Sequence, residues 1–285
     1  MSRLIAYMGN DPQRMRCAMH PGRAQFVDAA AGGTAIDGWG VGFYQGGEVL
    51  LQRRPKPPEL PLDLFEMLHD VKSDALIAHV RRGSYGVPKT ENTHPFRFRS
   101  WLFAHHGTVA HFDDVREAML ESVPDFLRRN IRGQTDSELL FHMFLAQLQL
   151  TGKLDDPTVS TRAVAGAMAQ AIAECDRVSR REGEPPSVLD LAATNGRVLA
   201  VSRRGRPVHY YRIDGIRDCP VCRETPAEFG RGPRPNDHEH LRAVVIVADG
   251  DTSPADPPLG APWLEVPEGS LITVSRDLEV ERIAL

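Results

Sequence analysis

The chain has 285 residues, with 34 basic and 38 acidic side chains and a formal net charge of −4. This balance lacks the excess of positive charge that is typical of proteins binding nucleic acids or acidic membranes, so we expect neither partner. The N-terminus has no long apolar segment and runs such as AVVIVA at 243–248 are too short to cross a bilayer, which predicts a cytoplasmic protein.

The first third of the chain carries strand patterns. The segment GWGVGFY at 38–44 alternates small and large residues, and Gly46-Gly47 precedes VLLQ at 49–52, which predicts a β-hairpin. The segments ALIAHVR at 75–81 and WLFAH at 101–105 are typical of buried strands between polar turns.

Helix patterns follow in the middle of the chain. Asp113 is placed to cap a helix with the sequence DVREAMLESV. Thr135 and Glu138 have the spacing of a capping box, which predicts a helix running to about Gly152. A third helix is expected at about 161–181, where helix-forming residues place apolar side chains on one face.

Strand patterns return in the last third. SVLDLAAT and RVLAVSRR flank Asn195-Gly196, a strong hairpin signal, and HYYRI, AVVIVA and SLITVSRD follow. A Gly- and Pro-rich excursion at about 214–240 is expected to be a loop or small insertion. The order of strands, helices and strands fits two sheets with helices packed outside them, in a single domain spanning 1–285.

Four segments carry side chains suited to a reaction centre. They are Ser2 near the N-terminus, AHVRRGS around Arg81, FAHHGTV around Gly107 and TDSE around Asp136. Each also has a purely structural interpretation. Arg81 could pair with a surface carboxylate, the two histidines could end a strand, and Asp136 could interact with a helix dipole.

Taken together, these motifs resemble the class II glutamine amidotransferases. The resemblance covers nearly the whole chain and rests, in order, on SRLIAYMG, GWGVGFY, AHVRRGSYG, ENTHPF, FAHHGTV, GQTDSELLF, ATNGRVLAVSR and PWLEVPEGSLITV. The chain looks most similar to a compact stand-alone branch that includes a γ-glutamyl hydrolase of ergothioneine synthesis. The resemblance implies an α+β fold, the four-layer αββα sandwich of the N-terminal-nucleophile hydrolases.

The resemblance also implies hydrolysis of a glutamine or γ-glutamyl amide through a covalent acyl-enzyme, with no cofactor required for catalysis. After removal of Met1, Ser2 would supply both the nucleophile and an α-amino base with a pKa of about 8. By position, Arg81 would bind the substrate α-carboxylate, Asp136 would bind the α-ammonium group, and Ser84 would help to hold the substrate.

Two residues depart from the family pattern. Ser2 stands where the family has Cys, and a hydroxyl is a weaker nucleophile than a thiol at neutral pH. His106 stands where the family has the Asn of an HNG motif, whose side chain forms the oxyanion hole with the backbone N–H of Gly107. Loss of such a donor typically lowers turnover by about 100- to 1,000-fold. The binding residues Arg81 and Asp136 are kept.

We therefore favour an amidotransferase-like protein that keeps a pocket for glutamine or a γ-glutamyl compound while its glutaminase activity is weak or absent. Such a protein would act in binding, or as a regulatory subunit of a separate synthetase or other protein partner. The alternative is an active amidohydrolase in which N-terminal Ser2 cleaves glutamine or a γ-glutamyl amide through an acyl-enzyme.

The excursion carries a candidate metal site. Cys219 and Cys222 form CPVC, and His238 and His240 form HEH near its end. These four residues could bind a structural zinc ion, and both histidines would face the same way in a strand. The alternative is two reduced cysteines and two solvated histidines on a loop. Cys17 carries no motif.

Overall fold

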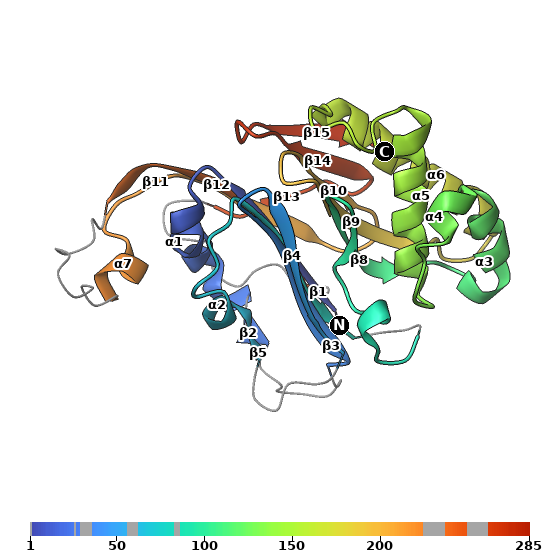
Figure 1. Cartoon of the computed structure of the whole chain (residues 1–285), viewed down its shortest axis with the longest axis horizontal. Helices are drawn as coiled ribbons and strands as arrows, with labels where there is room; N and C mark the ends of the chain where they lie inside the picture. The colour runs from blue at the N-terminus through green and yellow to red at the C-terminus, as the bar shows by residue number, and fades with distance from the viewer. Residues whose placement is uncertain are drawn as a thin grey trace.

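Two antiparallel sheets lie face to face with helices on both outer sides (Figure 1). The computed structural model describes residues 2–25, 27–28, 36–55, 62–82, 86–224, 237–249 and 262–285. The arrangement is the αββα sandwich that the sequence predicts. It follows from the layer rule, because each sheet must bury both of its apolar faces.

The larger sheet has seven strands in the order β13-β11-β12-β1-β6-β3-β4. Its central strands are covered on both faces, which explains their nearly continuous apolar sequences. The strands are β1 (Arg3–Gly9), β3 (Gly38–Gln45), β4 (Glu48–Arg54), β6 (Ala75–Arg81), β11 (Val208–Ile216), β12 (His238–Asp249) and β13 (Leu264–Glu265).

The second sheet has six strands in the order β15-β14-β10-β9-β8-β7. They are β7 (Phe96–Phe98), β8 (Trp101–Thr108), β9 (Val188–Thr194), β10 (Leu199–Arg203), β14 (Ser270–Val274) and β15 (Val280–Ala284). A separate two-stranded sheet pairs β2 (Val27–Asp28) with β5 (Leu62–Asp63).

The helices form the two outer layers. The six-stranded sheet is covered by α3 (Phe112–Glu121), α5 (Asp136–Leu150) and α6 (Thr161–Ser179), with α4 (Asp125–Arg128) against α5. The seven-stranded sheet carries α1 (Met15–Met19), α2 (Leu64–Met67) and α7 (Pro220–Glu224). Short 3-10 helices occur at Pro12–Arg14, His20–Gln25 and Thr90–Asn92. Across the described ranges, we find no helix with the length and hydropathy needed to span a bilayer.

The predicted hairpin of β3 and β4 is confirmed. Its two turn residues, Gly46 and Gly47, have φ angles of 61° and 84°, which residues other than glycine rarely adopt. Such a turn matches the right-handed twist of the flanking strands.

The N-cap predicted for α5 is confirmed, whereas the one predicted for α3 is wrong. The Thr135 hydroxyl caps α5 by accepting the N–H of Glu138 at 3.2 Å. The Glu138 carboxylate, however, accepts the N–H groups of Arg132 and Gly133 rather than closing a capping box. Asp113 does not cap α3, because that helix begins one residue earlier, at Phe112.

The layer between the sheets is an apolar core made by every second residue of the strands. It includes Leu4 of β1, Ile77 of β6, Leu102 of β8 and Ile246 of β12, all buried. The intervening residues face the outer helices instead. This alternation decides which side chains at the strand ends reach the space between the sheets.

Phe103 should be a stability determinant, because it joins β8 to α5. Its ring is buried and stacks on Phe141 with the ring centroids 5.1 Å apart. We expect Phe103→Ala to lower the free energy of unfolding by about 3–5 kcal/mol, as measured by urea denaturation. Phe126→Ala is the control, since Phe126 is 41% exposed and its loss should change stability by less than about 0.5 kcal/mol. Equal effects of the two substitutions would contradict this assignment.

Candidate functional site

Ser2 immediately precedes β1 and lies two residues before Leu4, so its side chain is directed between the sheets. Its hydroxyl donates to the carbonyl oxygen of Arg82 at 3.1 Å and accepts the N–H of Arg82 at 2.9 Å. Both bonds join the start of β1 to the chain just beyond β6. The backbone of the neighbouring strand therefore fixes the position of the hydroxyl.

Arg81 ends β6 and is buried on the same face as Ile77. Its Nη1 is 3.4 Å from Oδ2 of Asp37, and its Nη2 donates to the carbonyl oxygen of Gly86 at 2.9 Å. Burial lowers the pKa of Arg81, while Asp37 and Asp136 oppose the shift. A guanidinium group stays charged despite such a shift, so the site contains a buried cation.

Asp136 is the first residue of α5 and supplies the negative charge. Its Oδ2 accepts the N–H of Val109 at 2.9 Å, and its Oδ1 accepts the N–H of Ser137 at 2.8 Å. The carboxylate is buried at a helix N-terminus, where the helix dipole favours a negative charge. The bond from Val109 connects α5 to the loop that follows β8.

His105 lies on β8 and joins this strand to β9 and α5. Its Nε2 donates to the carbonyl oxygen of Val188 at 2.8 Å, and its Nδ1 lies 2.9 Å from Oγ of Ser137. Burial lowers the pKa of His105, although the charge of Asp136 opposes this. The ring thus connects β8 to β9 and to the first turn of α5, in which Asp136 lies.

Gly107 is required by a close approach of two strands. A Cβ atom at this position would lie 2.0 Å from the carbonyl oxygen of Val188 and 2.7 Å from Nε2 of His105. No side chain fits that space. The backbone N–H of Gly107, which the family resemblance places in the oxyanion hole, is thus fixed by strand packing.

His106 faces the layer between the sheets and is buried. Among the described residues, neither of its ring nitrogens has a hydrogen-bond partner. Burial, reinforced by the positive charge of Arg206, lowers the pKa of His106 to about 3. The ring is therefore neutral at physiological pH and offers one N–H donor rather than a positive charge.

The structure brings together most of the residues that the sequence singles out. Ser2, Arg81, Gly107 and Asp136 all line one small cleft, with a volume of about 30 Å³. His106 is not in the cleft wall, although both of its chain neighbours are. Ser84 lies outside the described residues.

Two histidines of the cleft were missed by the sequence analysis. His79 and His94 line it and are fully buried, with ring centroids 4.2 Å apart. Burial lowers the pKa of both, and no described residue forms a hydrogen bond with their ring nitrogens. Strand alternation could have identified His79, because it lies two residues before Arg81 on the same face.

Asp190 is a further buried acidic residue that no sequence pattern singled out. It pairs with His106 across the β8–β9 ladder and is buried. Burial raises the pKa of Asp190 to about 7, although its carboxylate accepts the N–H groups of Arg204 and Arg206. Its place in the apolar-looking segment SVLDLAAT gave no functional signal.

The predicted metal ligands are only partly brought together. Cys219, Cys222 and His238 form a buried cluster, in which the fourth member is Cys17 rather than His240. His240 is exposed. The two histidines do not share a face because the register of β12 against β11 shifts in the segment between His238 and Arg242, which breaks the two-residue alternation.

Residues 1–210 match the family model described as "Glutamine amidotransferases class-II". Because the match covers most of the chain, this protein belongs to the class II glutamine amidotransferases. Two solved structures share the fold over 99% of this chain. A glutamine aminotransferase class-II domain protein from Silicibacter pomeroyi has a TM-score of 0.57 and 22% identity over 98% of its chain. The glutamine phosphoribosylpyrophosphate amidotransferase from B. subtilis has a TM-score of 0.55 and 14% identity over 49% of its chain.

Curated relatives match shorter parts of the chain. The probable glutamine amidotransferase DUG3 of Saccharomyces cerevisiae is 31% identical over 181 residues, which is 59% of this chain and 51% of the relative. The gamma-glutamyl-hercynylcysteine sulfoxide hydrolase of Mycobacterium tuberculosis is 32% identical over 99 residues, or 34% and 41% of the two chains. The matches thus span about half or less of the relatives' lengths.

Replacement of Gly107 should disrupt the site and the fold together. Gly107→Ala forces β8 and β9 apart, because the new methyl group would meet the backbone of Val188. We expect a loss of about 1–3 kcal/mol or more in the free energy of unfolding, measured by urea denaturation. Gly166→Ala in α6 is the control, because a Cβ atom there meets open space. That change should stabilise the protein by about 0.5–1 kcal/mol, and a loss of stability there would undermine the comparison.

Acid should destabilise the protein through His106. Its folded pKa is about 3, whereas an unfolded histidine titrates near 6.5. Between these values the unfolded chain binds a proton that the folded chain does not, so the free energy of unfolding falls as the pH drops below about 6.5. In His106→Asn the slope should become shallower by up to about 1.4 kcal/mol per pH unit, as measured by urea denaturation at a series of pH values.

His240→Asn, which replaces an exposed histidine, is the matched control for this measurement. The remaining slope in His106→Asn is expected from the other histidines whose pKa values are lowered by burial, namely His79, His94, His105, His142 and His209. Identical slopes for the parent and His106→Asn would mean that His106 is not held neutral in the folded state.

Proposed function

We propose that this protein binds the amino-acid end of glutamine or of a γ-glutamyl compound in the cleft beside Ser2, and that it hydrolyses the amide slowly or not at all. The observation that carries the proposal is a contrast between the charged pair and position 106. Arg81 and Asp136 are kept and buried in the cleft wall, whereas position 106, which the family resemblance assigns to the oxyanion hole, carries a neutral imidazole that lies outside that wall.

The binding half of the proposal rests on charge complementarity. Arg81 and Asp136 carry opposite charges, come from different layers of the sandwich, and line the same cleft. The α-carboxylate and α-ammonium groups of an amino acid present the matching pair of charges on a single carbon atom. Burial of both side chains strengthens these interactions, since charges interact more strongly at low dielectric constant.

The reactive half of the proposal rests on Ser2 and His106. An active class II site needs a strong nucleophile and two donors for the tetrahedral oxyanion. The Ser2 hydroxyl is a weaker nucleophile than the family's thiol, and of the two family donors only the Gly107 N–H is kept. The His106 imidazole differs in shape and reach from an asparagine amide, and its low pKa removes the charge that could compensate.

The relatives support the ligand class. Their names refer to glutamine amidotransfer and to hydrolysis of gamma-glutamyl-hercynylcysteine sulfoxide. Glutamine and a γ-glutamyl compound share the glutamyl unit, so a pocket for its α-carbon substituents serves either one. A protein that binds this unit with little turnover suits a binding or regulatory subunit of a separate synthetase.

Restoring the family residues should restore activity. We expect the double variant Ser2→Cys/His106→Asn to release glutamate from L-glutamine at least about 100-fold faster than the parent, with smaller gains in the single variants. Glutamate and ammonia release would be measured with protein whose N-terminal mass shows that residue 2 is first. Adding Asp136→Asn to the double variant should abolish the gain, because the substrate ammonium would lose its partner.

Binding is the companion readout. L-glutamine or a γ-glutamyl dipeptide should raise the melting temperature of the parent, and Arg81→Gln should weaken binding by about 10- to 100-fold. Absence of any ligand effect on the parent would overturn the binding half of the proposal. Clear turnover by the parent that disappears in Ser2→Ala would overturn the reactive half and establish the active amidohydrolase instead.

A further inference from the structure

A second group of reactive side chains lies on the outer face of the seven-stranded sheet, away from the cleft. Cys17 comes from α1, Cys219 directly precedes α7, Cys222 lies on α7, and His238 begins β12. All four side chains are buried, and their ligand atoms lie within 4.8 Å of one another. Three segments that are distant in sequence thus converge on one point.

The distances within this cluster fit a tetrahedral metal site. Sγ of Cys17 is 3.6 Å from Sγ of Cys222, which is 3.3 Å from Nε2 of His238. Zinc binds cysteine sulfur at about 2.3 Å and histidine nitrogen at about 2.0–2.1 Å. Tetrahedral angles then separate two sulfur ligands by about 3.8 Å, and sulfur from nitrogen by about 3.6 Å. The ligand atoms therefore already have nearly the spacing that a central ion requires.

The same distances argue against other arrangements. A disulfide bond is about 2.05 Å long, so Cys17 and Cys222 are not bonded, and all four cysteines of the chain are free. Thiols are weak hydrogen-bond donors and acceptors, which gives little reason to gather three of them around one imidazole in a buried position. A soft divalent cation provides that reason.

We propose that Cys17, Cys219, Cys222 and His238 bind one Zn²⁺ ion in a structural site. Three thiolates and one neutral imidazole form a ligand set typical of structural zinc, and four protein ligands leave no position for a substrate. Nη1 of Arg14 lies 3.1 Å from Sγ of Cys222 and donates to it. This guanidinium group offsets the net negative charge that three thiolates leave around a divalent ion.

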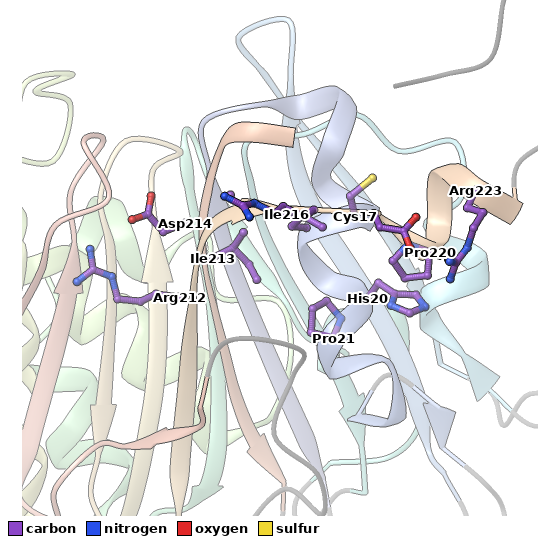
Figure 2. A pocket seen from close by; sticks show the side chains of 12 residues that line it. Cys17, His20, Pro21, Arg212, Ile213, Asp214, Ile216, Pro220 and Arg223 are labelled. Carbon is purple, nitrogen blue, oxygen red and sulfur yellow. Dashed lines mark hydrogen bonds and ion pairs between the residues drawn. The ribbon is translucent and has the colours of Figure 1, made fainter. Parts of the chain in front are cut away.

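The site would hold both ends of the excursion at about 214–240. Cys219 and Cys222 lie after β11, and His238 lies where β12 begins, so one ion joins these ends to α1. A cavity of about 520 Å³ lies beside the cluster, and Figure 2 shows Cys17 on its wall together with Pro220 and Arg223 of α7. The metal would therefore also set the position of one wall of this cavity.

Metal content of the purified full-length protein tests the proposal. We expect about one zinc ion per chain by elemental analysis, with the metal lost in Cys17→Ser and in His238→Ala. Cys175→Ser and His240→Ala are the matched controls and should keep the full content, because Cys175 lies in α6 and His240 is exposed outside the cluster. Full zinc content in Cys17→Ser, or loss in His240→Ala, would overturn the assignment.

Cobalt substitution keeps the test decisive if a variant fails to fold. The metal-free parent titrated with Co²⁺ should develop the visible bands of a tetrahedral site and a thiolate-to-metal charge-transfer band, both saturating at about one equivalent. A parent that contains no zinc as purified and gives no such bands with Co²⁺ would refute the site. Neither readout depends on glutamine binding or hydrolysis, so failure of the proposed function leaves it intact.

Discussion

The apolar layer between the two sheets determines where the candidate reactive side chains of this protein lie. Strand residues alternate between that layer and the outer helices, and the positions of Leu4 and Ile77 are fixed by burial. The same alternation carries Ser2 and Arg81 to the margin of the layer, where it opens into the cleft. A register slip of one residue would turn both side chains toward the helices, so the packing of the core and the geometry of the site cannot vary independently.

The two halves of the site differ in how strongly the fold depends on them. Asp136 accepts the backbone N–H groups of Val109, in the loop after β8, and of Ser137 in its own helix, and Arg81 is buried against Asp37 and Gly86. Loss of either would leave buried groups without partners, which is costly to stability. His106 makes no hydrogen bond among the described residues. The fold thus depends on Arg81 and Asp136 through hydrogen bonds, whereas it depends on His106 through burial alone.

The sequence alone predicts much of this architecture, because its signals are local. The Gly46-Gly47 turn and the Thr135 cap each depend on a few neighbouring residues. Which residue completes the cluster of Cys219, Cys222 and His238 depends instead on long-range packing and on the irregular pairing of β11 with β12. Cys17 approaches Cys222 from 205 residues away, and a register shift that no sequence pattern signals turns His240 to the surface. His94 likewise reaches the cleft only through tertiary packing.

The close approach of Gly107 to Val188 makes the main chain beside position 106 rigid. Close packing leaves no space between β8 and β9 at this point. A side chain exchanged at position 106 therefore meets a backbone of fixed course, so a difference between variants at this position would report on the side chain itself rather than on a displaced strand.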